Sequence, residues 1–190
     1  MGLVNHGITP TTPENILLGA GVYYKGLKWA DGAWTGTVLG ATSGGGKLSI
    51  KGELIDIEVD GALVKVKGLT VKQGGAASIE TTMVEITTDN IKLATMFKES
   101  ESDVEGYTLL EDKAHIEEGD YVDDFAFVGK TADGKKDIVV VFESALCTSG
   151  LELEPKGKEA SLLKLTMEAY AKIDGDLSTI PVKIYYPIVA

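Results

Sequence analysis

The sequence is poor in the residues that build disulfide frameworks and metal centres. It holds one cysteine and two histidines in 190 residues. A lone Cys147 excludes an intramolecular disulfide, and without a CxxC motif or a Cys/His cluster structural zinc is excluded as well. A chain of this length can instead bury a hydrophobic core without covalent cross-links. Cys147 ends an apolar stretch, so we expect it in the core of a protein from a reducing or redox-indifferent compartment.

Long apolar runs are also missing. No stretch approaches the roughly 18 apolar residues of a membrane-spanning helix. The first residues, MGLVNHGITPTTPEN, have neither the basic start nor the apolar middle of a signal peptide. We therefore expect a soluble protein without membrane insertion.

Positive charge is the minority sign. The chain carries 18 basic and 29 acidic residues, a net charge of −11. Affinity for DNA depends on Lys and Arg displacing the counterions around phosphate, so we do not expect stable DNA binding. DNA could still pass along such a surface without sticking to it.

Apolar residues recur mainly with period two, and turn residues interrupt them about every ten positions, which is typical of an all-β domain. We predict a two-sheet β-sandwich or barrel formed by residues 16–190, preceded by an extended N-terminal arm over 1–15. The predicted strands cover 17–24, 34–42, 47–61, 64–73, 77–87, 123–131, 136–147, 161–173 and 181–187. Ala132-Asp133-Gly134 is a strong hairpin signal between two of them.

Two local features modify this pattern. Between Leu54 and Ile55 the apolar phase of the 47–61 strand switches, which predicts a bulge there. The segment TTDNIKLATMF, 87–97, predicts one short helix flanking the sheet, with Thr88 as N-cap and Asp89 in the first turn. Its apolar residues Ile91, Leu93, Ala94 and Phe97 should pack on the sheet.

Glycine-rich segments resemble nucleotide-binding loops only in part. GATSGGGKL, 40–48, has Gly46 and Lys47 of a P-loop, but Ala41 and Leu48 occupy the other two required positions, and no helix is predicted after it. GAGVYY, 19–24, lacks the third glycine of a dinucleotide fingerprint. We interpret both segments as bends or close backbone contacts, and we expect no cofactor.

Catalytic chemistry has little support in the sequence. His6 and His115 are the only histidines, and no nucleophile-elbow motif occurs, so we expect no enzyme activity and place His115 on the surface. The loop acids Asp120, Asp123 and Asp124 lack EF-hand spacing, which makes calcium a minor alternative and solvated carboxylates the preferred interpretation. A carboxylate pair for glycoside hydrolysis is a further minor alternative.

The succession of segments resembles the tail tube proteins, or major tail proteins, of tailed bacteriophages, especially siphophages with Gram-positive hosts. The segments that carry the resemblance, from about residue 13 onwards, are ENILLGAGVYYKGL, GTVLGATSGGGKLSIKGELIDIEVDG, ITTDNIKLA and PVKIYYP. The resemblance implies a β-sandwich with one helix that assembles into hexameric rings. Stacked rings would form the tail tube, a structural virion component assembled in the host cytoplasm, through which DNA is ejected.

The same resemblance implies contacts and partners. Channel-lining candidates are Glu53, Asp56 and Glu58, whose charge would let DNA slide. Contacts between subunits or rings are expected from the loop 25–38 and from the arms at 1–15 and 181–190. The candidate residues there are Ile16, Leu17, Trp29, Trp34, Ile184 and Tyr185. Besides copies of itself, the implied partners are tail tip, tape measure and tail terminator proteins.

Two alternatives remain at this stage. A tube protein of a phage-tail-like particle or secretion system would share the fold and differ in cargo. A carbohydrate-binding β-sandwich would belong to another class, and it would need an aromatic platform or closely spaced carboxylates.

Overall fold

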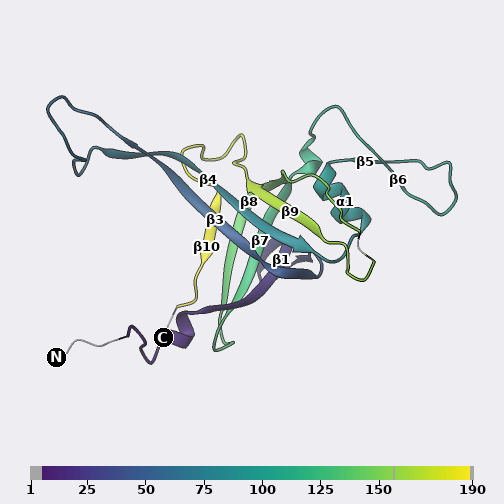
Figure 1. Ribbon diagram of the computed structural model, residues 1–190, viewed down its shortest axis with the longest axis horizontal. Helices are drawn as coiled ribbons and strands as arrows, with labels where there is room; N and C mark the ends of the chain where they lie inside the picture. Colours follow the sequence, from purple (N-terminus) through teal and green to yellow (C-terminus); the bar gives the residue numbers. More distant parts are fainter. Residues whose placement is uncertain (1–5, 156, 189–190) are drawn as a thin grey trace.

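A computed structural model describes residues 6–155 and 157–188 (Figure 1). The chain is mainly β, with 48% strand and 8% helix, which confirms the predicted fold class. The bounds of the strands are β1 Leu17–Ala30, β2 Ala33–Val38, β3 Thr42–Asp56, β4 Thr70–Met83, β5 Lys98–Ser100, β6 Leu109–Glu111, β7 Val122–Thr131, β8 Asp137–Cys147, β9 Leu163–Ala169 and β10 Val182–Tyr185. The helices are α1 Thr88–Thr95 and the 3-10 helices η1 Thr12–Asn15 and η2 Glu118–Asp120.

One large antiparallel sheet organises the fold. Its strand order is β2-β1-β7-β8-β9-β4-β3, and β10 pairs with β8 beside it. β5 and β6 form a separate two-stranded sheet. β8 is the centre because its run DIVVVFESALC is buried almost throughout, as expected of a strand covered on both faces. The predicted hairpin around Ala132-Asp133-Gly134 joins β7 to β8.

The large sheet curls over so that its two ends approach each other. β1 and β3 are far apart in the strand order, yet they are in contact, and in Figure 1 β3 and β4 cross over the strands around β8. Tyr23 of β1 is buried together with side chains of β4, β7, β8, β9 and α1. The sandwich-like core therefore lies inside one continuous folded sheet. The sheet does not close, so the barrel form of the prediction is wrong.

The helix α1 begins one residue earlier than predicted. Thr87, not Thr88, is the N-cap, and its hydroxyl accepts a 3.2 Å hydrogen bond from the Asn90 N–H. Leu93 and Ala94 are buried as expected, and Asn90 is buried with them. Ile91 and Phe97 are only half-buried.

Three predicted segments differ from the structure. Residues 25–38 are not a loop, because β1 and β2 form a hairpin whose turn residues Asp31 and Gly32 have φ values of 52° and 80°, as in a primed turn. The separate strands predicted at 64–73 and 77–87 are replaced by one strand, β4. The register shift near Leu54 lies between Gly52 and Leu54, and the extra residue belongs to β4, not to β3.

The glycines of GATSGGGKL form a bulge at the start of β3. Five residues of β3, from Thr42 to Gly46, oppose three of β4, and Gly44 and Gly45 have φ values of 78° and 76°. A Cβ at Gly46 would collide with the Tyr23 hydroxyl and lie 2.7 Å from the carbonyl oxygen of Glu80. The predicted bend is confirmed, and its glycines allow β1 and β3 to approach.

The predicted N-terminal arm spans 1–15, of which 1–5 lie outside the described residues. Its end, η1, is attached to the body of the protein. The Glu14 carboxylate lies 3.4 Å from Lys136 Nζ, and Asn15 accepts a 3.1 Å hydrogen bond from the Tyr186 hydroxyl. No helix in 6–155 and 157–188 is long and apolar enough to cross a membrane.

Candidate subunit interface

The β3–β4 hairpin projects far beyond the body of the protein. In Figure 1 it extends to the upper left, away from the core. From Lys51 to Ala76 every residue is exposed except the half-buried Leu69. We call residues 51–76 the arm. The arm buries nothing against the body. Packing in the core of its own chain therefore does not explain which residues the arm contains.

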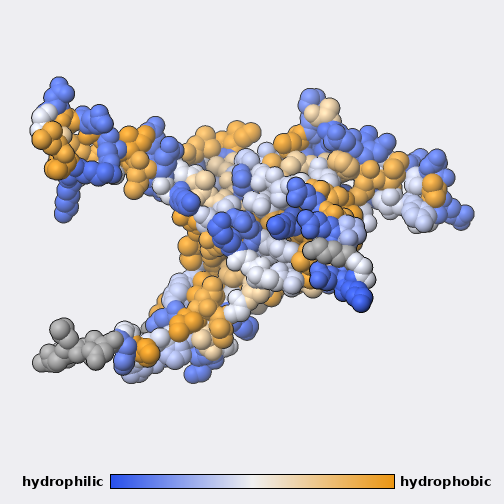
Figure 2. Space-filling view, in the orientation of Figure 1, coloured by the Kyte–Doolittle hydropathy of each residue, from blue (hydrophilic) through white to orange (hydrophobic). Residues whose placement is uncertain are grey.

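The arm carries apolar side chains in an unusual number for a solvent-exposed hairpin. Leu63 and Val64 at the tip are 97% and 77% exposed, and Leu54 is 66% exposed. The other exposed aliphatic residues of the arm are Ile55, Ile57, Val59, Val66 and Val71. Figure 2 shows apolar side chains interspersed with polar ones along the arm. Eight exposed aliphatic side chains on one hairpin are more apolar surface than a free hairpin needs, and exposed apolar surface marks interaction sites in soluble proteins.

The arm leaves the body at a glycine pair. Gly74 and Gly75 have φ values of 82° and 150°, and the register of the hairpin shifts beside them. A Cβ at Gly75 would lie 2.5 Å from the Lys51 carbonyl oxygen and 2.6 Å from Ile180 Cδ1. Only glycine therefore fits this bend, which sets the direction of the arm relative to the sheet.

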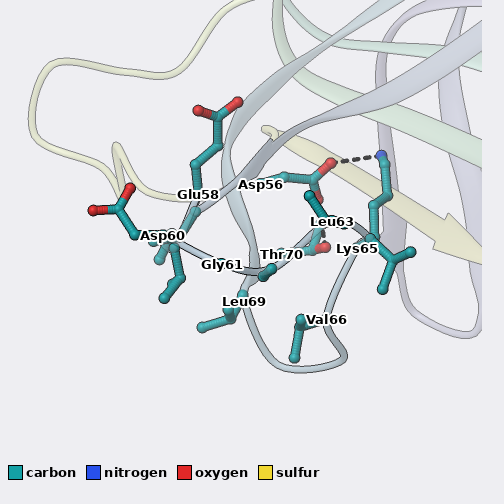
Figure 3. A pocket seen from close by; sticks show the side chains of 13 residues that line it. Asp56, Glu58, Asp60, Gly61, Leu63, Lys65, Val66, Leu69 and Thr70 are labelled. Carbon is teal, nitrogen blue, oxygen red and sulfur yellow. Dashed lines mark hydrogen bonds and ion pairs between the residues drawn. The ribbon is translucent and has the colours of Figure 1, made fainter.

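The tip of the arm is a wide loop, residues 57–69, around a hollow of about 490 Å³ (Figure 3). At its base Lys65 Nζ and the Thr70 hydroxyl each lie 2.5 Å from an oxygen of Asp56. These contacts lower the pKa of Asp56, with the hydrogen bond from Lys65 as the largest cause. The ion pair thus closes the loop where the β-ladder ends.

The predicted channel-lining acids all lie on this arm. Glu53 and Asp56 belong to β3, and Glu58 lies in the tip loop. Glu53 and Asp56 are three positions apart in a strand, so they belong to opposite faces of the hairpin. In Figure 3 Glu58 points away from the Asp56–Lys65 pair. The structure therefore does not gather the three carboxylates on one surface of the subunit.

The predicted contact residues fall into two groups. Trp34 packs edge-on against both Trp29 and Tyr185, with ring centroids 5.3 and 4.9 Å apart. Ile184 neighbours this aromatic cluster on β10, which is paired with β8 and is thus part of the sheet rather than a free arm. Ile16 and Leu17 lie at the opposite end of β1, where Leu17 pairs with Thr131. All of these residues except the half-buried Trp34 are exposed.

Charge is distributed unevenly between the arm and the opposite side of the molecule. Residues 98–120, around β5 and β6, contain nine acidic residues and two lysines, so this lobe carries −7 of the net charge of −11. In Figure 1 it lies on the right, on the side opposite the arm. The arm itself contains four acidic residues and four lysines and is neutral. An apolar, neutral arm can approach an acidic neighbour without the repulsion that two acidic surfaces would produce.

The side chains considered for catalysis or metal binding do not come together in one site. Asp120, Asp123 and Asp124 each lie next to a different lysine, at 2.7 Å from Lys113, 3.2 Å from Lys172 and 3.3 Å from Lys28, respectively. Over the described part of the chain no group of three or more His, Cys, Asp or Glu residues could hold a metal ion. His115 is exposed, as predicted. Cys147 is fully buried in the core, as predicted.

Sequence reasoning missed the arm as an interaction surface. A signal existed, because LIDIEVDGALVKVK has apolar residues in both strand phases, and a strand with one buried face should have them in one. Neither a family model nor a curated protein matches this sequence.

Proposed function

We propose that this protein is a structural, non-enzymatic subunit of a bacteriophage tail tube, located in the virion and assembled in the cytoplasm of the bacterial host. Copies would join into hexameric rings, and the rings would stack into the conduit through which DNA is ejected. The observation that carries the proposal is the arm, whose exposed aliphatic residues have no partner surface in their own subunit. The sequence resemblance supplies the kind of assembly.

Burial in a neighbouring subunit would provide the missing stabilisation. Full burial of a Val, Leu or Ile side chain contributes about 1.5–3 kcal/mol relative to exposure. Association of two copies costs translational and rotational freedom, which only a surplus of buried apolar area can offset. Eight aliphatic residues on one arm offer that surplus. We therefore assign the arm the principal contact between subunits.

The open sheet supports ring formation. β2 and β3 end the strand order, and neither has a second partner strand within residues 6–155 and 157–188. Unpaired N–H and C=O groups at such edges readily bind another chain. In a closed ring each edge could meet that of a neighbour, so that no edge would remain. The acidic net charge suits a conduit that must not retain DNA.

A related assignment is a tube protein of a phage-tail-like particle or secretion system. It rests on the same observations, the arm and the open edges of the sheet. The two differ in what passes through the tube and in the partners at its ends. For the phage assignment these partners would be tail tip, tape measure and tail terminator proteins.

The proposal is tested by electron microscopy of the purified protein over a concentration series, together with sedimentation to give the mass. We expect rings or hollow tubes at high concentration. Leu63→Asp, at the arm tip, should abolish them, because it places a charge where apolar burial is required. Leu177→Asp is the matched control, since Leu177 is also exposed but lies far along the chain in the loop before β10.

Monomers of Leu63→Asp should melt at the same temperature as wild type, because Leu63 contacts no core residue of its own subunit. A wild-type protein that stays monomeric at every concentration, with its arm cleaved by protease as fast as an unstructured peptide, would overturn the proposal. Equal loss of assembly in the two variants would show that the arm is not the specific contact.

A further inference from the structure

Three residues on neighbouring strands line up next to the acidic lobe. Asp123 of β7 pairs in register with Ser144 of β8. On the other side of β8, Ala145 pairs with Ala169, and the Tyr170 N–H continues this register by donating a 2.9 Å hydrogen bond to the Ser144 carbonyl. Directly opposed residues of antiparallel strands present their side chains on one face. Asp123, Ser144 and Tyr170 therefore form a row across the sheet.

This row is the floor of a pocket of about 430 Å³. Tyr121, two residues before Asp123, and Lys172, two residues after Tyr170, extend it on the same face. The rings of Tyr121 and Tyr170 are 5.5 Å apart and nearly perpendicular, so they form a corner of apolar ring surface. Glu118 and Asp174 also line the pocket.

Ser144 is the unusual member of the row. It is 94% buried, since only 6% of its surface is exposed, and it lines the pocket. Its hydroxyl makes no hydrogen bond to any described residue, and it is not among the fully buried unpaired side-chain atoms, so it is open to the pocket. An unpaired hydroxyl at the floor of an open pocket is available to a ligand.

Around Ser144, hydrogen-bond donors lie next to hydrogen-bond acceptors. Lys172 Nζ lies 3.2 Å from Asp123 Oδ2, so an ammonium donor and a carboxylate acceptor adjoin each other next to the serine. Hydrogen bonding to Asp123 raises the pKa of Lys172, which keeps its ammonium charged. This arrangement matches hydroxyl groups, because each hydroxyl both donates and accepts.

Charged ligands fit the pocket less well. An anion would meet the carboxylates of Glu118, Asp123 and Asp174, and a cation would meet the ammonium of Lys172 beside Asp123. A neutral ring with hydroxyls at its edge and C–H groups on its face avoids both penalties. Its apolar face can stack on a tyrosine while its hydroxyls replace water at Ser144 and Asp123.

We propose that this pocket binds a neutral saccharide, with one pyranose ring stacked on Tyr170 and its hydroxyls hydrogen-bonded to Ser144, Asp123 and Lys172. The site lies on the body of the subunit and does not include the arm. Sugar binding can therefore be measured on the monomer whatever the outcome for tube assembly, and it would give the protein a second role in recognising glycans.

The test is saturation-transfer NMR and calorimetric titration of the full-length protein with four probes: glucose, galactose, mannose and N-acetylglucosamine. We expect at least one to bind saturably at millimolar concentration or below. Ser144→Ala should weaken that binding about tenfold without lowering the melting temperature, because it removes a hydroxyl that has no partner in the free protein.

Thr81→Val is the matched control. The Thr81 hydroxyl likewise has no partner among the described residues, but it is fully buried and does not line this pocket. It should retain full sugar binding. A second pair of variants separates the aromatic contribution: Tyr170→Ala should abolish binding, and Tyr107→Ala, at an exposed tyrosine outside the pocket, should leave it unchanged.

Three outcomes would overturn the proposal. One is that none of the four sugars binds saturably. Another is that Ser144→Ala and Thr81→Val bind a sugar equally well, which would place the sugar elsewhere. The third is that tetramethylammonium or inorganic phosphate, titrated as charged probes, binds in the pocket more tightly than every sugar. None of these results depends on whether rings or tubes form.

Discussion

Lys65 reaches back across the tip of the arm to Asp56, and its ammonium lies 2.5 Å from a carboxylate oxygen. The two residues are separated by most of the tip loop, and their contact closes that loop beside the last β-ladder pair, Asp56 with Thr70. The two sides of the arm tip are therefore joined through one carboxylate.

The Asp56–Lys65 pair predicts that the arm tip opens in acid. The pKa of Asp56 is lower in the folded protein than the unfolded value of about 3.9. The contribution of this ionisation to stability is therefore complete above that unfolded value and is lost as the pH falls through the lowered folded pKa. The N–H of Ile57 donates to the Leu69 carbonyl at 2.8 Å, and its protection from amide exchange, relative to the intrinsic exchange rate, should fall over that range.

Asp56→Asn is the control for this pH dependence. Its tip should be less protected from exchange already at neutral pH, and this protection, taken relative to the intrinsic exchange rate, should not fall further as acid is added. If wild-type Ile57 exchange follows only the intrinsic pH dependence of an amide until the whole protein unfolds, the ion pair does not close the tip.

The close packing around Gly46 predicts that a single added methyl group strongly lowers the stability of the protein. Gly46→Ala should destabilise the protein by about 1–3 kcal/mol, the usual cost of overpacking, because the new Cβ would collide with the Tyr23 hydroxyl. Gly119→Ala, where no atom lies within 4 Å of the added Cβ, is the control. Chemical denaturation measures both.

A double variant distinguishes this collision from a general glycine effect. Tyr23→Phe removes the colliding hydroxyl, so it should recover part of the stability lost in Gly46→Ala. The contact with the Glu80 carbonyl oxygen at 2.7 Å should keep the recovery incomplete. Additive losses in the double variant would contradict the contact as described.

Asn90 predicts that α1 is fixed to the sheet by a polar contact as well as by Leu93. Its side-chain amide donates to the Glu85 carbonyl at 3.1 Å and, at a longer 3.5 Å, to the Leu39 carbonyl. Asn90→Ala should lower the free energy of unfolding by about 1–3 kcal/mol, because buried carbonyl oxygens lose a donor. Asp89→Ala, at an exposed neighbour, should cost less than about 1 kcal/mol. Equal losses would show that helix propensity alone is responsible.

Local features of the fold were predictable because local chemistry determines them. The β7–β8 hairpin follows from Ala132-Asp133-Gly134, and the single helix follows from a capping threonine before an apolar pattern. The bulge at 42–46 follows from three successive glycines. Each depends on residues within a few positions of one another.

Long-range features were not predictable in the same way. The pairing of β1 with β7 depends on Gly21, which leaves room for the ring of Phe127 more than a hundred residues away. The 25–38 segment was expected to be a loop that makes contacts between subunits or rings, yet the turn at Asp31-Gly32 makes it a hairpin. Of the expected contact residues, Trp29, Trp34 and Tyr185 meet only because β10 lies beside β8.

The pocket proposed for saccharides was missed for a related reason. Asp123 was considered only with its sequence neighbours Asp120 and Asp124. Its relevant neighbours, Ser144 and Tyr170, come from other strands and are brought together by register. Single residues on separate strands leave no spacing pattern in the sequence.

The pairing of β10 with β8 also has a consequence during synthesis. Phe142 of β8 pairs with Val182. This edge of the central strand therefore has no partner strand until a segment about forty residues downstream has been synthesised. At about 5–20 residues per second, translation leaves the edge of Val139–Phe142 uncovered for about two to eight seconds. During that interval the nascent chain presents its most apolar strand to other chains, and chaperone binding at Val139–Phe142 would protect it until β10 emerges from the ribosome.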